Sequence, residues 1–389
     1  MKKSIIRQED GVSLVELIIT MVIFVLIMTA ASGMFAGLLT QFKQQSKIAE
    51  TNIEGLVGLE IMRQDIEHAG YGLPWIFQSA ITYAEPSSSP ASTYNEPANS
   101  LPRAIFSGNN VDFAGTNPYD GSDYLVVKAI NVATNTVSPK WTTLSNALPY
   151  TRTWVPDTEN LVSADRVIVI TPGTNDTNAR TLIVDASGAF FTTFGSVTLS
   201  PWPPLDATET RVVYGLTSTD PVRPFNRADY FINRPSTGMP SRCAPKTGVL
   251  YKAKFDANGT SSVLPLLDCV ADMQVVYALD NDEDGDFVSG EGTPADAYSE
   301  DISTLTVQQI RNRVREVRVY ILSHEGQKDP NFTYPSSTIA IPPIHVPPDP
   351  AAGLGRPSPG FDLTTIDAND YKYYRWKLYT LIVKPIGLR

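Results

Sequence analysis

The sequence predicts an α+β protein in which one long N-terminal helix packs on a mostly antiparallel β-sheet domain with long loops. Two observations carry this prediction. Proline is absent from residues 12–69, and short β-like runs separated by turn-rich stretches follow over residues 75–389. An uninterrupted helix of that length exceeds the ~8–20 residues usual in globular proteins. Strands that follow one another without intervening helices are typical of an antiparallel sheet.

The first eleven residues, MKKSIIRQEDG, form a predicted leader that is set apart from the fold. Their basic residues Lys2, Lys3 and Arg7 predict that this end stays on the cytoplasmic side of a membrane. Residues 17–39 then carry no charge, and as a helix they would span about 35 Å against roughly 30 Å for the bilayer core. A cleavable secretory signal has a shorter apolar core, of about 7–15 residues, followed by its cut site. We therefore expect residues 12–39 to remain embedded in the membrane.

Glu16 lies at the upstream edge of this apolar run. A charged carboxylate at the centre of a membrane helix costs roughly 2.5–3.5 kcal/mol on insertion scales, and less near an end. Such a residue normally has a partner of opposite charge, so its position needs an explanation.

The stretch G-V-S-L-V-E-L, residues 11–17, resembles the class III signal of type IV prepilins. The resemblance implies that prepilin peptidase cuts between Gly11 and Val12 and that the new amino terminus on Val12 is methylated. It also implies that Glu16, five residues into the mature chain, pairs with the terminal amine of a neighbouring subunit. The family usually has phenylalanine at the first mature position, where this chain has Val12. A generic signal anchor is the alternative interpretation.

The helix is predicted to continue beyond the membrane. Apolar residues recur every three or four positions over residues 49–69, which places them on one helix face. Gly70, Gly72 and Pro74 then end the helix. We expect a stem over residues 12–73 that packs on the domain, because its apolar stripe is too short and irregular for a coiled coil.

Residues 74–389 form the predicted globular domain. One further helix is expected at residues 306–314, where Thr306 and Gln309 have the spacing of a capping box. Two turn-rich stretches, residues 84–102 and 341–360, are predicted to be surface loops. The β-like runs cover residues 124–130, 166–171, 181–186, 211–216, 248–255, 273–279, 316–323 and 374–386.

Composition excludes several classes of function. The net charge of −10 argues against nucleic acid as a partner, since phosphate binding needs a basic surface. Three histidines and two cysteines are too few and too scattered for a zinc or haem site. The chain contains no G-x-S-x-G, H-E-x-x-H or Walker A motif. We therefore do not expect an enzyme.

Three segments resemble the PilW family of minor type IV pilins: DIEHAGYG (65–72), LPLLDCVADMQVVYALDNDEDGD (264–286) and YRWKLYTLIVKPIGLR (374–389). No resemblance is found between about residues 75 and 240. The resemblance implies a single-pass inner-membrane protein whose domain lies in the periplasm and later on a pilus at the cell surface.

The resemblance implies that the protein helps to initiate pilus assembly or forms the pilus tip, and that it thereby contributes to adhesion and motility. The implied partners are prepilin peptidase, other major and minor pilins that pack through the stem helix, and a tip adhesin. Two other classes remain open: a minor pseudopilin of a type II secretion system, and a surface-displayed binding module on a pilin stem.

Cys243 and Cys269 lie 26 positions apart in the region predicted to be exported. An oxidising compartment favours a disulfide between them. The alternative is two unrelated buried thiols.

The segment DNDEDGDFVSGE, residues 280–291, meets the calcium-loop pattern D-x-D-x-D-G-x5-E in full. The helices that flank such a loop in an EF hand are missing, because residues 273–279 are predicted to form a strand. We expect an EF-hand-like calcium loop on a β scaffold, and a solvated acidic turn is the alternative. The expected ligands are Asp280, Asp282, Asp284, Asp286 and Glu291.

Overall fold

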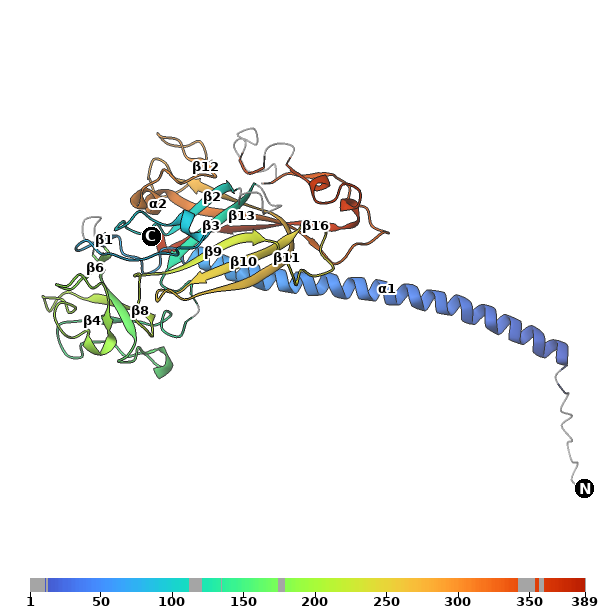
Figure 1. The fold of residues 1–389 in the computed structure, drawn as a ribbon, viewed down its shortest axis with the longest axis horizontal. Helices are drawn as coiled ribbons and strands as arrows, with labels where there is room; N and C mark the ends of the chain where they lie inside the picture. Colours follow the sequence, from blue (N-terminus) through green and yellow to red (C-terminus); the bar gives the residue numbers. More distant parts are fainter. Residues whose placement is uncertain are drawn as a thin grey trace, which may run out of the picture. The chain divides into compact units, whose positions relative to one another are not determined.

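The computed structural model describes residues 11, 13–111, 121–133, 135–173, 179–341, 354–356 and 360–388. The chain divides into two compact units, Met1–Glu50 and Thr51–Arg389, and each is described by itself. One helix, α1 (Leu14–Glu67), supplies the described structure of the first unit apart from Gly11 and Ser13 (Figure 1). The predicted long helix and the α+β class are confirmed.

α1 ends at Glu67, before the predicted stem boundary at residue 73. The chain then turns through Gly70 and Gly72, whose φ angles are +85° and +69°. Side chains rarely adopt this left-handed region, so glycine is the residue that lets the chain leave a helix here.

A large antiparallel sheet forms the centre of the second unit (Figure 1). Its strand order is β16-β13-β11-β10-β9-β3-β2, with β12 paired to β11. Every described pairing in it is antiparallel. The strands are β2 (Ile105–Val111), β3 (Ser122–Ala129), β9 (Asn226–Asn233), β10 (Gly248–Phe255), β11 (Ser261–Leu279), β12 (Ala297–Ser299), β13 (Val314–Glu325) and β16 (Arg375–Val383).

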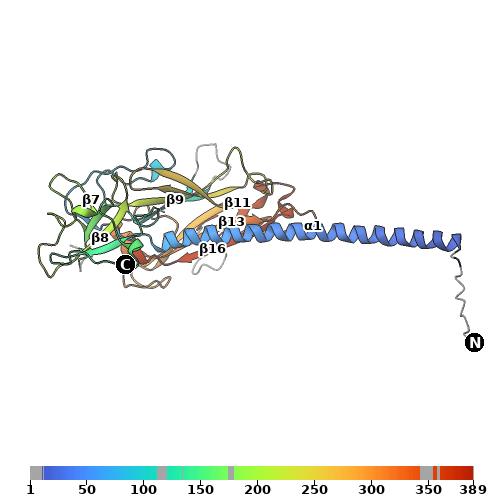
Figure 2. The same ribbon diagram turned by 90° about the horizontal axis from the view of Figure 1, so that it is seen from below.

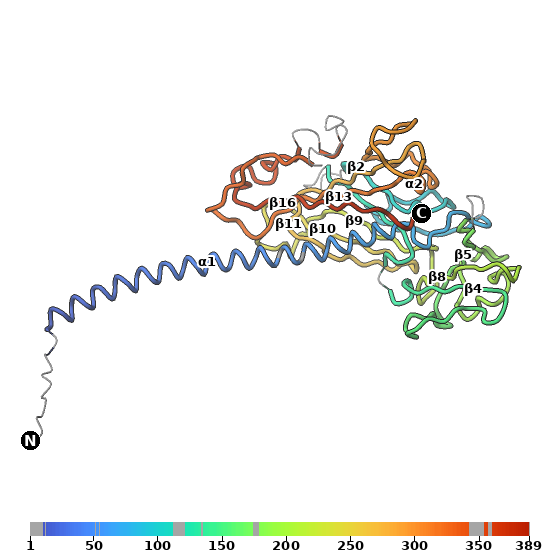
Figure 3. Tube along the Cα trace, turned by 180° about the vertical axis from the view of Figure 1, so that it is seen from behind, coloured from blue at the N-terminus to red at the C-terminus, as the bar shows by residue number. Residues whose placement is uncertain are grey.

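A smaller sheet lies at one end of the second unit (Figure 3). Its order is β1-β6-β5-β8-β4, with β7 paired to β5. All of it comes from the part of the chain without family resemblance, and it has a core of its own around Val167, Val169, Val213 and Trp202. The strands are β1 (Ile76–Phe77), β4 (Trp141–Leu144), β5 (Arg166–Thr171), β6 (Thr181–Leu182), β7 (Thr192–Thr193) and β8 (Arg211–Thr217).

Short elements complete the fold. The predicted second helix is α2 (Val307–Arg313), and its capping box is present. The Gln309 amide donates to Thr306 Oγ1 at 3.2 Å, and the Thr306 amide donates to Gln309 Oε1 at 2.9 Å. A two-stranded ladder joins β14 (Thr338–Ile339) and β15 (Phe361–Asp362). Single 3-10 turns occur at Ala91–Tyr94, Asp157–Glu159, Phe194–Ser196, Leu363–Thr365, Tyr371–Tyr373 and Ile386–Leu388.

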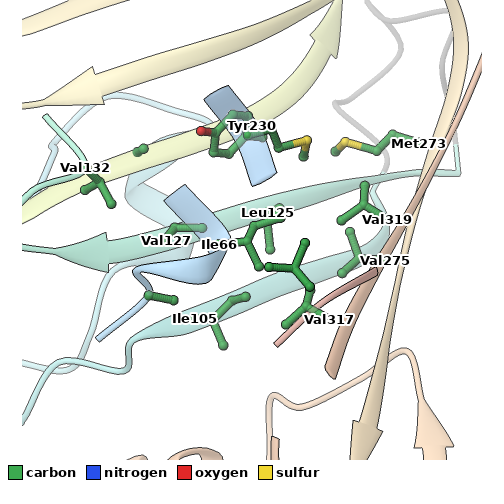
Figure 4. Packing of buried hydrophobic residues seen from close by; sticks show 14 of the residues in the cluster. Ile66, Ile105, Leu125, Val127, Val132, Tyr230, Met273, Val275, Val317 and Val319 are labelled. Atoms are coloured by element: carbon green, nitrogen blue, oxygen red, sulfur yellow. The ribbon is translucent and has the colours of Figure 1, made fainter. Parts of the chain in front are cut away.

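The last turns of α1 run along the face of the large sheet (Figure 2). Leu59, Met62, Ile66 and Ala69 are buried there. Figure 4 shows Ile66 among side chains of β2, β3, β11 and β13. Full burial of such side chains stabilises a fold by roughly 1.5–3 kcal/mol each. The last part of the predicted stem therefore packs on the sheet.

The helix also approaches β11 unusually closely at one point. A Cβ atom added to Gly58 would lie 2.1 Å from the backbone oxygen of Leu266. Only glycine allows the two backbones to come this near.

Candidate functional site

The start of α1 is capped by a serine. Ser13 accepts hydrogen bonds at its carbonyl from the Leu17 amide (3.1 Å) and at Oγ from the Glu16 amide (3.3 Å). Serine followed three residues later by glutamate has the spacing of a capping box, and a carboxylate near a helix N-terminus is favoured by the helix dipole. The structure thus adds a local role for Glu16 that the sequence reasoning did not consider. Gly11 lies just upstream, whereas Val12 is outside the described residues.

Beyond the cap, the helix surface is apolar. Glu16 is the only charged residue between Leu14 and Phe42. The large apolar side chains of this stretch are exposed in the chain taken alone. Among the described residues, α1 is the one helix long and apolar enough to cross a membrane, on length and composition. Such a surface needs an apolar environment, either lipid or other helices.

In the last turns of α1, a buried polar contact connects the helix to the large sheet. Tyr230 on β9 donates a hydrogen bond to Asp65 Oδ2 at 2.5 Å, and the Lys252 ammonium on β10 forms an ion pair with the same oxygen. A carboxylate this deeply buried needs such partners, because an unpaired buried charge is strongly destabilising. The contacts of Asp65 with Tyr230 and Lys252 also fix the rotation of the helix about its axis.

The predicted acidic loop joins β11 to β12. Asp280 follows directly on β11 and is fully buried, Asp282 is half-buried and Asp284 is exposed. One carboxylate oxygen from each of these three residues lies within 4.8 Å of the other two. Asp286 and Glu291 are not part of this group. The structure thus brings together three of the five expected ligands.

Charged neighbours hold the loop in place. Arg315 Nε donates to Asp280 Oδ2 at 2.9 Å, and the Gly285 amide donates to the same oxygen at 3.0 Å. Although burial disfavours the ionised form, these bonds lower the pKa of the Asp280 carboxyl. Glu283 points to α2 instead, where Arg313 Nε donates to it at 2.8 Å.

Uncompensated charge remains elsewhere in the loop. Partial desolvation and the neighbouring charge of Asp284 raise the pKa of Asp282. Loss of hydration and repulsion by Asp286 and Asp284 raise the pKa of Glu291. The carboxylates therefore repel one another in the absence of a cation.

Cys243 and Cys269 are joined by a disulfide, with their Cα atoms 4.9 Å apart. The bond connects the segment before β10 to the middle of β11. Next to it, the Ala244 amide donates to His324 Nε2 at 2.8 Å. Burial lowers the pKa of His324 to about 3, so its ring is neutral and accepts this hydrogen bond.

A buried ion cluster was missed by the sequence reasoning. Glu85 accepts from Lys128 Nζ (2.9 Å) and from Arg227 Nη1 (2.8 Å), while Arg227 also pairs with Asp229. Lys128, Arg227 and Asp229 are fully buried on β3 and β9. The stretch 84–102 was predicted as a surface loop, but Glu85 and Glu96 turn inward to meet these charges. Lys128, a charged residue inside the predicted β-like run 124–130, was the available signal.

A small aromatic pocket lies on the smaller sheet. The rings of Trp141 and Trp154 are tilted by 55° to each other, with their centroids 4.8 Å apart. Together with Lys140, Val155 and Glu159, among others, they line a pocket of about 220 Å³.

Comparisons with known proteins agree with this geometry at both ends of the chain. A model of the prokaryotic N-terminal methylation motif matches residues 6–32, which include Gly11 and Glu16. With the exposed apolar helix, this match defines a prepilin-like protein related to type IV pili, and it implies processing by prepilin peptidase.

The second match is more specific. The model of type IV pilus-assembly protein W covers residues 229–378, from β9 to the start of β16. The resemblance to the PilW family is confirmed, and it points to a structural pilus component instead of an enzyme. No curated protein and no solved structure matches the chain.

Proposed function

We propose that this protein is a minor type IV pilin. Prepilin peptidase cuts it after Gly11 and methylates Val12, and the mature protein then helps to initiate pilus assembly or forms the pilus tip. α1 holds it in the inner membrane, with the domain first in the periplasm and later on the pilus. The observation that carries the proposal is the exposed apolar surface of α1 with Glu16 as its only charge.

The physical argument concerns how this surface is covered. Burying apolar area contributes roughly 25 cal/mol per Å², so the exposed side chains favour lipid before assembly and neighbouring stems afterwards. Glu16 would be costly among packed stems unless a cation neutralises it. Cleavage after Gly11 removes Lys2, Lys3 and Arg7 and creates a new amine four residues upstream of Glu16. The amine of an adjacent subunit is then a suitable partner.

Substitution of Glu16 by glutamine tests this pairing. Glutamine removes the charge but keeps the size of the side chain, whereas Glu16→Ala removes the side chain. Both variants keep the backbone amide that donates to Ser13 Oγ. We expect both variants to insert into the membrane and to be absent from sheared pili in immunoblots. Glu50→Gln is the matched control, because Glu50 forms an exposed ion pair with Lys47 at 2.6 Å and such pairs contribute little. Normal incorporation of Glu16→Gln would show that assembly does not need the charge of this carboxylate.

The same stem would serve a minor pseudopilin of a type II secretion system. The two functions differ in where the mature protein is found. A pilin is recovered in sheared surface fibres, whereas a pseudopilin stays in the cell envelope. Recovery from the envelope alone, in cells that make pili, would favour the pseudopilin.

A binding role is the second candidate function, and the aromatic pocket favours it. Trp141 and Trp154 line the pocket together with Lys140 and Glu159, and the Arg152 guanidinium lies over the Trp154 ring, 4.2 Å from its centroid. The pocket is smaller than the roughly 300–1,000 Å³ typical of small-molecule sites, so we propose a single ring, such as one sugar unit, as its occupant. Trp154→Ala should reduce adhesion of piliated cells without changing pilus number. Unchanged adhesion would remove this candidate.

A further inference from the structure

Strand pairing and hydrogen bonds within the loop set the path of the loop between β11 and β12. β11 and β12 pair through Leu279 and Ala297, at the two ends of the loop. Asp296 is buried, and its two carboxylate oxygens accept from the amides of Asn281 (2.7 Å) and Val288 (3.0 Å). Asp296 therefore braces the loop internally.

Asp280 is the group within this frame that needs a further partner. Its Oδ2 is satisfied by Arg315 and Gly285. Its Oδ1 is buried and receives no hydrogen bond from any described residue. A buried carboxylate oxygen without a donor or a cation is costly. Oδ1 lies on the carboxylate that clusters with those of Asp282 and Asp284.

The local charge balance also requires a cation. Arg315 pairs with Asp280, and Arg313 pairs with Glu283. In the part of the chain that the structure describes, no ion pair with Lys or Arg is found for Asp282 or Asp284. Three carboxylates thus converge with one guanidinium beside them.

We infer that this loop binds a calcium ion through the carboxylates of Asp280, Asp282 and Asp284. Calcium prefers oxygen ligands at about 2.3–2.6 Å. Two oxygens bound to one such ion are therefore at most about 5 Å apart, which agrees with the 4.8 Å limit of this group. Magnesium demands shorter, octahedral contacts. Water completes the coordination, so the affinity is expected to be weak, with a dissociation constant on the order of 10⁻⁴ M.

The consequence is a loop whose order depends on calcium. Bound calcium neutralises the carboxylates and holds residues 280–284 together, and the Asp282 carboxylate lies beside Gly292 on the facing part of the loop. The inference is independent of the proposed pilin function, since it concerns only the isolated subunit.

The test uses the full-length protein in detergent micelles after chelator treatment. Calorimetric titration and thermal unfolding are measured with calcium and, separately, with magnesium, each up to ~5 mM, well above the expected dissociation constant. We expect binding and a raised unfolding temperature with calcium, and a much smaller response to magnesium.

Three single-charge variants make the test specific. Asp282→Asn and Asp284→Asn alter side chains that are not fully buried, so the fold should persist, and each should weaken calcium binding about tenfold or more. Glu283→Gln lies between them and removes the same charge, but its side chain faces Arg313 and Asn312. It should bind calcium as the unsubstituted protein does. Absence of calcium binding, an equal response to magnesium, or an equal loss in Glu283→Gln would overturn the inference.

Discussion

Replacing Gly58 by alanine places a methyl group between α1 and β11. The added carbon would lie 2.1 Å from the Leu266 carbonyl oxygen and 2.8 Å from its carbonyl carbon. Both atoms belong to the backbone of β11, which pairs with β10 on either side of Leu266, through Pro265 and Leu267. A shift of this backbone would disturb that pairing, so we expect the helix to move away from the sheet.

The magnitude follows from two opposing effects. Alanine gains about 1 kcal/mol over glycine in a helix interior, whereas overpacking typically costs about 1–3 kcal/mol and occasionally more. Because the contact is with fixed backbone, we expect the upper part of that range and a net loss of about 2 kcal/mol. Displacement of α1 would also loosen Met62 and Ile66 in the core.

Gly55→Ala is the matched control on the same helix. Its added carbon would meet only the ends of two side chains, Leu267 Cδ1 at 3.2 Å and Tyr379 Oη at 3.4 Å. These atoms can shift by a few tenths of an ångström, so helix propensity should dominate and stability should stay equal or rise by up to about 1 kcal/mol. The changes in the free energy of unfolding caused by Gly58→Ala and Gly55→Ala are thus expected to differ in sign.

The assay is chemical unfolding of the full-length protein in detergent, followed by tryptophan fluorescence from the sheet domain. The free energies of unfolding of Gly58→Ala and Gly55→Ala are compared with that of the unsubstituted protein. Equal or increased stability of Gly58→Ala would refute the close contact between the two backbones.

Three further predictions concern processing, oxidation and pH. N-terminal sequencing of protein from sheared pili or membranes should start at residue 12, and a larger residue in place of Gly11 should block the cut; a start downstream of residue 39 would contradict the prepilin assignment. Mass spectrometry of non-reduced exported protein should show the Cys243–Cys269 cross-link, whose loss should cost about 3.5 kcal/mol on the chain-entropy model; free, alkylatable thiols would contradict it. The folded-state pKa of His324 is lowered from 6.5 to about 3. Between these two pH values the unfolded chain therefore binds a proton that the folded protein excludes. The free energy of unfolding should fall by up to about 1.4 kcal/mol for each pH unit as the pH falls from 6.5 to 3. His324→Gln should flatten that dependence between pH 6.5 and 5, and an unchanged slope would show that another group is responsible.

Elements with strong local patterns were predicted correctly from the sequence. The absence of proline from residues 12–69 determined α1, and the Thr306–Gln309 spacing determined the cap of α2. β5 and β10 have the predicted bounds, because alternating or continuous β-branched and apolar residues favour a strand wherever it is placed. Gly70 and Gly72 likewise determined the turn after the helix.

Elements that depend on distant partners were not predictable in this way. β9 was missed because Arg227 and Asp229 interrupt its apolar pattern, and their burial depends on Glu85, 142 positions before Arg227 along the chain. The division into two sheets likewise depends on which strands pair. The local sequence pattern does not specify this pairing.

The acidic loop is likewise only partly predictable from the sequence. The sequence by itself determined which residues have the spacing of a calcium loop. Only the tertiary structure decided that Asp280, Asp282 and Asp284 converge while Asp286 and Glu291 stay outside the group. The reason is physical: Arg315 on β13 orients Asp280, Arg313 draws Glu283 away, and Asp296 sets the path of the loop. Side-chain direction in a loop depends on such contacts, which form only when the strands have come together.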